Sequence, residues 1–326
     1  MTKQESDALS AKLQRAIARA PATASVDEAR SRAFAALALA GDAPEASERE
    51  MKKIVDEWWR EKIVPSLSGG EDVLPREGRY ALFELLHVVR DNLNIDLRET
   101  ARPYFENLAA LDLLSYYPAS YTAPENEYRV PATASGAVDV HAAECARAAD
   151  LAMAAYDTTS VGSEFLLGWV LHDSFAMRGA FGAPYEFLWA NPYQPGLSYF
   201  HAPLAAHDVE AGQLFVRSGW EDGARWAGVF GGRLQTFANG KPQTIDLGSP
   251  KLLDFDHAVV AVAGRAAAIT VENPATRIFL VGLEPRRAYR LGIGHREREE
   301  HADAGGIIDL EFSDGFRGTI RIRAQR

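Results

Sequence analysis

The stretch HDSFAMRGAFGAPYEFLWANPYQPGLSYFHAPLAAH, residues 172–207, separates two parts of the chain with different hydrophobic patterns. Upstream of it, apolar residues recur at the spacing of amphipathic helices. Downstream they occur in short runs typical of strands. The stretch itself combines aromatic side chains with prolines, whereas flexible linkers are polar and rich in Gly and Ser. We therefore expect an ordered, packed loop at the junction of two domains, where ligand sites often lie.

The part before this junction has the features of a series of helices. Ser25 and Glu28 form a capping box, which marks a helix start, and Pro21 ends the helix before it. Residues 79–94 are the most informative segment, because apolar side chains recur there on one helical face and polar ones on another. We expect an α-helical domain over residues 1–207.

The part after the junction is typical of antiparallel strands. Short apolar runs follow one another at spacings of about 8–12 residues, with turn signals between them. Asn239-Gly240 and Asp314-Gly315 are two such signals. The predicted fold class is α+β, with the helical domain followed by an antiparallel β-sandwich over residues 208–326.

Composition limits the classes of partner. The 326 residues are 47% hydrophobic and carry a net charge of −10, which argues against nucleic acid as the partner. A local basic cleft on such a protein would still suit an anionic glycan. The N-terminus has no signal peptide, and no window reaches about 18 apolar residues, so we expect no membrane span. This predicts a cytoplasmic protein, or a periplasmic or secreted one if a leader lies upstream of Met1.

The sequence predicts no cofactor and no metal. It contains no Walker loop, no GxGxxG and no GxSxG pattern. His201, His207 and Asp208 lie close together, but their spacing does not define a metal site. Cys145 is the single cysteine, which excludes an internal disulfide and fits a reducing compartment. Its helical surroundings indicate a small buried group rather than a nucleophile.

A polar stripe runs along the helix predicted over residues 79–94. Glu84, His87, Asp91 and Asn94 follow one another at steps of three, four and three, and Arg90 flanks them. A neighbouring acidic group can tune a histidine for acid–base chemistry. The alternative is a solvated helix face, which is common on amphipathic helices.

Two loops combine aromatic and polar side chains, as sugar sites do. Sugar rings stack on Trp and Tyr, while Asn, Glu, Arg and His bind hydroxyl and acid groups. The alternative is that these aromatics join the two domains. The candidate substrate contacts in the first loop are Glu125, Asn126, Tyr128 and Arg129, and those in the second are Tyr185, Trp189, Asn191, Tyr193, Tyr199 and His201.

The segments HDSFAMRGAFGAPYEFLWANPYQPGLSYFHAP (172–203) and GQLFVRSGWEDGARWAGVFGG (212–232) give the chain a family resemblance. Residues 80–325 resemble the heparinase II/III-type and alginate-lyase-type polysaccharide lyases, and Arg217-Ser218 is similar to an arginine-serine pair of that group. The resemblance implies an incomplete α/α toroid before a β-sandwich, and β-elimination on a uronic-acid glycan. The segment GVFGGRLQTFANGKPQTIDLG (228–248) has no histidine where that group has a histidine-rich motif.

β-Elimination needs a group that neutralises the sugar carboxylate and groups that move protons. The candidates that would neutralise the carboxylate are Arg90, Asn94, Arg129 and Asn191. Glu84 of the polar stripe is a further candidate substrate contact. The candidates for proton transfer are His87, Tyr128, His172 and Tyr199.

Two other functions fit the same sequence. The first is a non-catalytic glycan-binding or scaffolding protein, which the missing histidine motif favours. The second is a glycoside hydrolase using a pair among Glu84, Glu125 and Asp173, whose carboxyl groups would lie roughly 5–9.5 Å apart. The sugar, the linkage and the oligomeric state are left open by the sequence.

Overall fold

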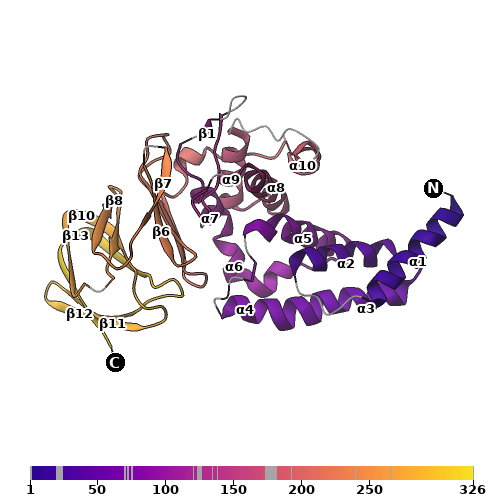
Figure 1. Ribbon diagram of the computed structural model, residues 1–326, viewed down its shortest axis with the longest axis horizontal. Helices are drawn as coiled ribbons and strands as arrows, with labels where there is room; N and C mark the ends of the chain where they lie inside the picture. The colour runs from indigo at the N-terminus through magenta and orange to yellow at the C-terminus, as the bar shows by residue number, and fades with distance from the viewer. Residues whose placement is uncertain are drawn as a thin grey trace.

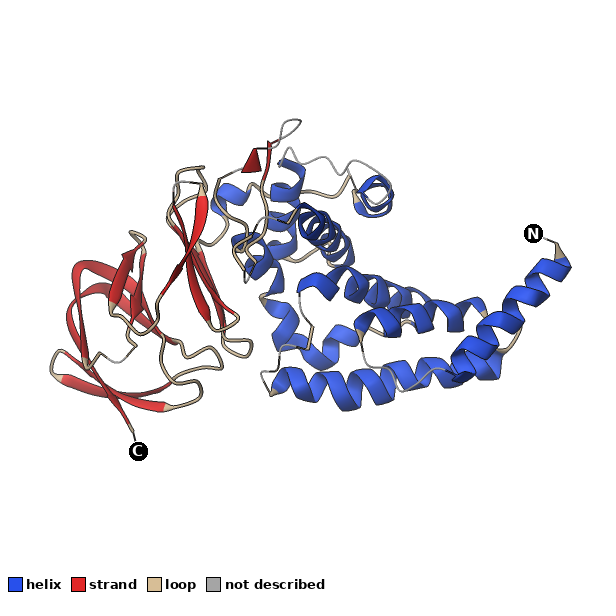
Figure 2. Ribbon diagram, in the orientation of Figure 1, coloured by secondary structure: helices blue, strands red, loops and turns tan. Residues whose placement is uncertain are grey.

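The computed structural model of the chain has a helical part followed by a strand-rich part, which Figures 1 and 2 show side by side. Apart from one short hairpin, helices precede strands along the chain, which confirms the predicted α+β class. The structure describes residues 2–19, 25–69, 71, 73–74, 76–119, 121–122, 127–133, 135–137, 139–172, 182–191, 193–238, 240–264 and 266–325.

The helical part begins with α1 and α2, followed by a long rod in which α3, the π-helical segment η1 and α4 continue one another (Figure 1). The predicted capping box is present: the Ser25 hydroxyl accepts from the Glu28 amide, and the Glu28 carboxylate accepts from the Ser25 amide. The elements are α1 (Lys3–Arg19), α2 (Val26–Ala38), α3 (Pro44–Lys52), η1 (Lys53–Ile63), α4 (Val64–Ser68), η2 (Arg76–Gly78), α5 (Arg79–Leu93), η3 (Leu97–Ala101), α6 (Arg102–Glu106), α7 (Leu108–Leu114), β1 (Tyr121–Thr122), β2 (Glu127–Tyr128), α8 (Val140–Tyr156), α9 (Val161–His172), α10 (Gly182–Trp189) and η4 (Tyr199–His201).

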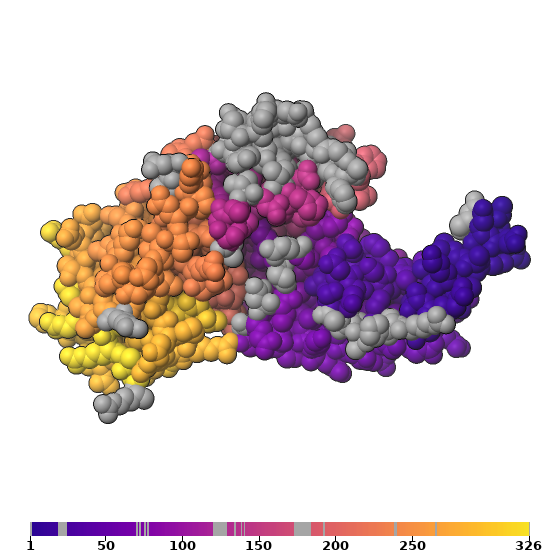
Figure 3. Space-filling model, in the orientation of Figure 1, coloured from indigo at the N-terminus to yellow at the C-terminus, as the bar shows by residue number. Residues whose placement is uncertain are grey.

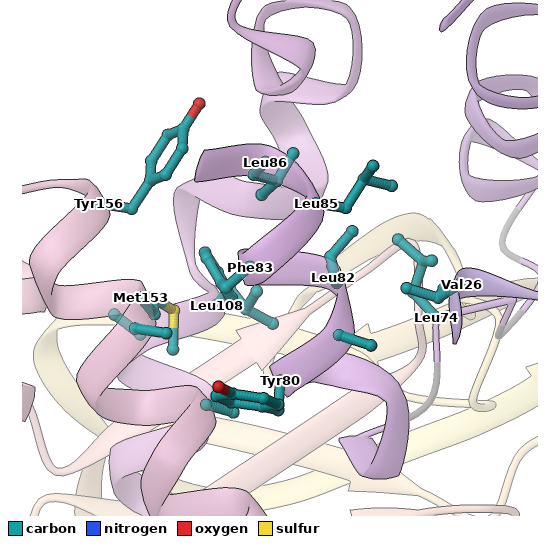
Figure 4. Close-up of a cluster of buried hydrophobic side chains, with 14 of the residues drawn as sticks. Val26, Leu74, Tyr80, Leu82, Phe83, Leu85, Leu86, Leu108, Met153 and Tyr156 are labelled. Atoms are coloured by element: carbon teal, nitrogen blue, oxygen red, sulfur yellow. The ribbon is translucent and has the colours of Figure 1, made fainter. Parts of the chain in front are cut away.

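Helix α5 is the centre of this part. It packs against α2 on one side and α8 on the other, so its side chains are buried over most of its circumference. Figure 4 shows Leu82, Phe83 and Leu86 among side chains from other segments, including Met153 and Tyr156 of α8. A helix enclosed in this way cannot present a solvated polar face along its whole length.

The first sheet is a meander. Among the described residues, β3 (Ala205–Asp208), β4 (Gln213–Arg217), β5 (Trp226–Phe230), β6 (Arg233–Ala238) and β7 (Lys241–Ile245) pair in chain order, each antiparallel to the next. Ala238 lies opposite Lys241, which confirms the hairpin predicted from the Asn239-Gly240 signal. Asn239 itself lies outside the described residues.

The second sheet corrects two predictions. Asp314-Gly315 is not a turn between strands, because β13 (Ile308–Ala324) continues through it, and one strand pair is parallel rather than antiparallel. Its order in the described chain is β12-β11-β13-β10-β9-β8, and β9 runs parallel to the second half of β10. Parallel neighbours need a crossover of about a dozen residues, and here the first half of β10 supplies it. The bounds are β8 (Lys251–Asp254), β9 (Ala258–Val262), β10 (Ala268–Val281), β11 (Ala288–Ile293), β12 (Arg296–His301) and β13 (Ile308–Ala324).

The two sheets share an apolar core. Leu214, Val229 and Leu234 of the first sheet pack with residues of the second such as Val260 and Phe279. The opposite face of the second sheet buries a separate cluster between its own strands. Strand β9 is consequently buried on both faces, which explains its unbroken apolar sequence AVVAV.

The helical part and the first sheet form one continuous core. Figure 3 shows the two parts in direct contact, and Phe215, Trp220 and Trp226 belong to the same buried cluster as the helices. The Trp226 indole donates to the Leu114 carbonyl over 2.8 Å. The strands therefore complete the core of the helices as well as their own.

A second polar connection lies beside this tryptophan. The Tyr117 hydroxyl donates over 3.0 Å to the side-chain carbonyl of Gln235, which is fully buried. The Gln235 amide donates over 2.8 Å to the Thr133 carbonyl. Burial raises the pKa of Tyr117 to about 12, so its hydroxyl keeps the proton that it donates.

Trp226→Phe should lower the free energy of unfolding by about 1–3 kcal/mol, because it leaves the Leu114 carbonyl buried without a donor. Urea denaturation followed by circular dichroism measures this. Trp220→Phe is the matched control, because the buried indole N–H of Trp220 has no hydrogen-bond partner in the described protein. Equal losses in the two variants would show that the hydrogen bond contributes little.

His207 forms ionic contacts that link the first sheet to the second. Its Nε2 lies 2.7 Å from Asp303 Oδ2 and its Nδ1 lies 3.4 Å from Asp309 Oδ2. Arg277 donates to Asp309 from the neighbouring strand. Burial alone would lower the pKa of His207, but the hydrogen bonds to the two carboxylates outweigh it and raise that pKa. The imidazolium is thus the form that joins the sheets.

His207→Gln should remove a pH-dependent part of the stability. A raised folded-state pKa contributes stability below the unfolded value of about 6.5, and this is lost as the pH rises through the folded value. We expect the variant to lose about 3 kcal/mol at pH 6 and clearly less at alkaline pH, by calorimetry of the whole chain. His201→Gln, at an exposed histidine, is the control. A loss that is independent of pH would contradict the ionic role.

Candidate functional site

A cleft opens where the helices meet the first sheet. This junction cleft has a volume of about 450 Å³. Arg76, Arg79, Asp112 and Ser115 line its helical wall, and Phe215 and Phe230 line its strand wall. His141 and Cys145 on α8 also line it. The cleft therefore combines a charged wall with an aromatic one, which is the usual composition of a small-molecule site.

Two arginines on the helical wall share one carboxylate. Arg79 forms an ion pair with Asp112 Oδ1, and Arg76 Nη1 lies 3.4 Å from the same oxygen. Arg76 Nη1 also donates to the Ser115 hydroxyl. Burial lowers the pKa of Arg79, and its contact with Asp112 compensates the burial of both charges.

The local sequence explains how these groups converge. Arg76 lies on the turn η2 and Arg79 is the first residue of α5, so both extend from the same helix end. Asp112 lies in the last turn of α7, and Ser115 caps the C-terminus of that helix. The end of α7 therefore lies next to the start of α5, with strands β4 and β5 across the cleft.

A second buried pair lies behind this wall. The Tyr116 hydroxyl donates over 2.6 Å to Asp150 Oδ2, and the Arg76 guanidinium lies 5.1 Å from the centre of the Tyr116 ring. Burial raises the pKa of Tyr116 well above its usual value, and burial also raises that of Asp150. Tyr116 consequently stays protonated and acts as a donor.

Several polar atoms of this wall are buried without a hydrogen bond inside the described protein. They include Arg76 Nη2, Arg79 Nε and Asp112 Oδ2. Buried donors and acceptors are usually paired. Arg76 is the more accessible arginine, with 19% of its side chain exposed against 8% for Arg79. It is therefore the wall group best placed to bind a ligand oxygen.

Part of the predicted polar stripe is covered by α10. The structure brings Glu84 and His87 together with Tyr185 and Trp189, four of the residues predicted to bind a substrate or move a proton. The Trp189 ring stacks on His87 at 4.5 Å between ring centres, and Tyr185 packs on Tyr80 at 4.4 Å. Glu84 accepts from Tyr80 and from Arg30.

His87 uses both of its ring nitrogens inside the protein. Nε2 lies 3.0 Å from the Ala152 carbonyl, and Nδ1 lies 3.2 Å from Arg90 Nη2. A carbonyl only accepts and a guanidinium only donates, so the imidazole is neutral with its proton on Nε2. Arg90 also donates to the Tyr156 carbonyl over 2.9 Å. In this arrangement His87 and Arg90 tie α5 to α8.

Asn94, predicted to bind a carboxylate, ends α5. Its φ of 56° and ψ of 37° are left-handed, a conformation that asparagine tolerates better than most residues at a helix C-terminus. Its backbone N–H donates to the Arg90 carbonyl over 2.8 Å. Its position at the left-handed C-terminus of α5 is therefore enough to explain why the residue is asparagine.

The proton-transfer candidates do not share one set of neighbours. His172 is exposed at the end of α9, and its ring lies 5.4 Å from that of the buried Tyr199. Tyr199 also packs on Phe200 and Trp220. Neither ring contacts His87. His201 follows on the same 3₁₀ turn and is exposed.

The remaining predicted contacts lie at the surface or outside the described residues. Arg129 donates to Asp222 over 2.5 Å and to the Pro118 carbonyl. Tyr193 is 93% exposed and its amide donates to the Asn191 side chain. Tyr128 pairs through its backbone in β2, but its side chain, Glu125, Asn126 and the possible hydrolase carboxylate Asp173 lie outside the described residues.

The arginine-serine pair of the family resemblance forms part of the β4–β5 turn. Arg217 is buried, donates to the Gly219 carbonyl over 2.6 Å and lies 4.0 Å from the centre of the Trp220 ring. Burial lowers its pKa to about 10. The Ser218 hydroxyl accepts from the Arg225 amide. Both residues stabilise the turn.

The junction cleft was not predicted residue by residue. Its signal in the sequence is a charged residue inside an apolar segment. Asp112 lies within LAALDLLS at α7, and Asp150 lies within RAADLAM of α8. A carboxylate at such a position is buried only with a partner. The sequence alone does not show that Arg76 and Arg79 are those partners.

Comparisons with known proteins add no relative: no protein-family model, no curated protein and no solved structure matches the chain. In the described ranges, no three His, Cys, Asp or Glu side chains are arranged to hold a metal ion. Within the same ranges, none of the helices has both the length and the apolar character that a membrane span requires.

The neutral state of His87 can be tested by titration. Burial is the main cause that lowers its pKa, and the nearby Arg90 lowers it further. We therefore expect its imidazole to remain neutral below the reference value of about 6.5 and to gain a proton only at lower pH, where the folded state loses stability. Two-dimensional NMR of the ring nitrogens, assigned with His87→Gln, measures this. Titration at or above the reference value would contradict it.

Proposed function

We propose that this chain is a carbohydrate-active protein that binds an acidic oligosaccharide in the junction cleft. The observation that carries the proposal is the pair of arginines on one wall, which share Asp112, opposite the aromatic wall of Phe215 and Phe230. Arg76 also lies 3.9 Å from Asp150. A uronic acid presents a carboxylate on one side and apolar C–H groups on the other, and so matches both walls.

Arg76 is the proposed carboxylate ligand. Its side chain is 19% exposed, and its guanidinium is held in place by Ser115, by the ring of Tyr116 and by Asp150 at 3.9 Å. A planar guanidinium binds a carboxylate through two parallel hydrogen bonds. Arg79 is the more buried of the two and is committed to Asp112, so its role is to position Asp112 and, through it, Arg76.

The reaction that we propose is β-elimination, in line with the family resemblance. Arg76 would disperse the charge of the sugar carboxylate and acidify the neighbouring C–H. His141, at the cleft, is the candidate base, because imidazole is the commonest group in general acid–base catalysis. His141 would take the C–H proton, the C–H electron pair would form the C=C bond, the glycosidic C–O bond would break, and the imidazolium of His141 would return the proton to the leaving oxygen.

The finer description of the fold belongs to the same proposal. We propose that the helical part is an incomplete α/α toroid and that the two sheets form a β-sandwich. The shared apolar cluster of the two sheets supports the second part, and the crossing helices beside them support the first.

Non-catalytic glycan binding is the second candidate. Two groups that could move a proton are already occupied inside the protein, which favours binding without catalysis. The Tyr116 hydroxyl donates its proton to Asp150, and both ring nitrogens of His87 have partners. No tyrosine lines the cleft in the described part of the chain. Binding would then rely on Arg76 and the aromatic wall without turnover.

Calorimetric titration with a short uronate oligosaccharide tests the binding. Arg76→Gln should weaken it by roughly 10- to 100-fold, because one charge-assisted contact is lost. Arg49→Gln, at an exposed arginine of α3, is the matched control and should bind as the wild type does. The proposal is wrong if the wild type binds no acidic oligosaccharide, or binds neutral ones equally well.

Turnover is tested separately with a panel of uronate polymers, by the ultraviolet absorbance of the unsaturated product. His141→Ala should abolish product while leaving oligosaccharide binding unchanged. If the wild type binds but yields no product from any polymer, the non-catalytic function is the correct one.

A further inference from the structure

We propose a second anion-binding site on the outer face of the second sheet, at a hollow lined by Arg290, Arg296, Arg321 and Arg323, which we call the basic hollow. It has a volume of about 190 Å³ and is floored by Gly292 and Gly294. It shares no lining residue with the junction cleft. Figure 1 shows its strands β11 and β12 near the C-terminus.

The pairing of β11 with β13 places positive charges next to each other, an arrangement that does not itself stabilise the sheet. Arg290 of β11 lies between Glu299 of β12 and Arg323 of β13. Its pairing with Arg323 brings like charges together, which destabilises a direct cross-strand pair, and Glu299 offsets part of this repulsion. Arg321 lies opposite Gly292 on one side and Ala268 on the other, so only small residues flank it. A polyanion bound across these strands would offset the repulsion.

The four arginines differ in their acidic neighbours. Arg290 has Glu299 as its direct partner in β12. Arg290 lies 3.9 Å from Glu297, and both side chains are more than half exposed. Arg296, Arg321 and Arg323 form no ion pair with a described residue. Four arginines with one lining carboxylate are a strong local excess of positive charge on a chain whose net charge is −10.

Gly292 keeps the hollow open. Its φ is not positive, and an added Cβ would meet the Arg321 side chain at 3.4 Å, which is an ordinary contact. The backbone therefore does not require glycine there. Any larger residue in the middle of β11 would project between Arg290 and Arg321 and fill the space.

The ligand that we infer is an acidic polysaccharide, recognised by its carboxylate or sulfate groups. Apart from His295, the described lining offers no ring on which a nucleic-acid base would stack. The choice of a glycan rests on the function proposed for the junction cleft. The affinity of the hollow for anions does not depend on it.

Affinity electrophoresis of the full chain in gels containing alginate, dextran sulfate or neutral dextran tests the site. Arg321→Thr with Arg323→Thr should weaken retention by both anionic polymers about 10-fold at low salt and reduce the salt dependence. Neutral dextran should retain neither protein. Arg15→Gln with Arg49→Gln, which removes the same charge from exposed helical positions, should behave as the wild type does.

Gly292→Thr is the second variant, because it fills the hollow without changing the charge. It should also weaken retention, with its thermal unfolding midpoint confirming that the sheet is intact. Wild-type retention in both variants, or equal loss in the helical control, would overturn the site. Equal affinity for a DNA single strand of the same charge would overturn the choice of a glycan.

Failure of this site is distinguishable from failure of the junction cleft. Arg76→Gln should lose affinity for a short uronate oligosaccharide while keeping the retention by long polymers that depends on Arg321 and Arg323. The opposite pattern is expected of the double threonine variant. If Arg76→Gln alone removed all retention by the polymers, the basic hollow would not be a separate site.

Discussion

The packing of the first sheet against the ends of α7 and α8 is the constraint on which the rest of the molecule depends. Trp226 and Gln235 reach from β5 and β6 into the helical part, where their polar atoms meet Leu114, Tyr117 and Thr133. The bonds to Leu114 and from Tyr117 are buried and the bond to Thr133 is partly buried. The two parts therefore cannot separate without exposing apolar area and leaving polar atoms unpaired. The junction cleft has its shape because this contact fixes both of its walls.

The α+β class could be predicted from the sequence, because it rests on periodicity. The stretch 172–207 is predicted to be a loop, but its described part contains helix α10, the turn η4 and the start of β3. The capping box at Ser25 and the hairpin at Asn239-Gly240 were predictable because they depend only on near neighbours. The parallel pairing of β9 with β10 depends on a crossover inside a single long strand. No local pattern distinguishes that arrangement from an ordinary hairpin.

The candidate site is predicted less well, for a related reason. Periodicity places Glu84 and His87 on one helical face, but it does not show that α10 covers that face with Tyr185 and Trp189. The grouping of Arg76 and Arg79 with Asp112 joins residues more than 30 positions apart. Such a grouping follows from tertiary packing, and a single sequence contains no direct record of it.

Charge is distributed unevenly over this acidic protein. In the junction cleft, the buried Arg79 pairs with Asp112 and the partly exposed Arg76 lies near the same carboxylate, so these contacts mainly compensate burial. In the basic hollow, Arg290 pairs with Glu297, whereas Arg296, Arg321 and Arg323 form no ion pair with a described residue. We therefore expect salt to screen the charges of the hollow more strongly than those of the cleft.

The two sheets differ in how far apart in the sequence their paired strands lie. Strands β3 to β7 pair with their neighbours in sequence, whereas β10 pairs with β13, which begins about 30 residues later and joins β10 to β11. Closing a long loop costs entropy before its contacts form. We expect the meander to assemble first on the helices and the second sheet to close only once β13 is docked. In pulse-labelled hydrogen exchange, amides of β4 and β5 would then gain protection before those of β9 and β10, and the reverse order would exclude this folding sequence.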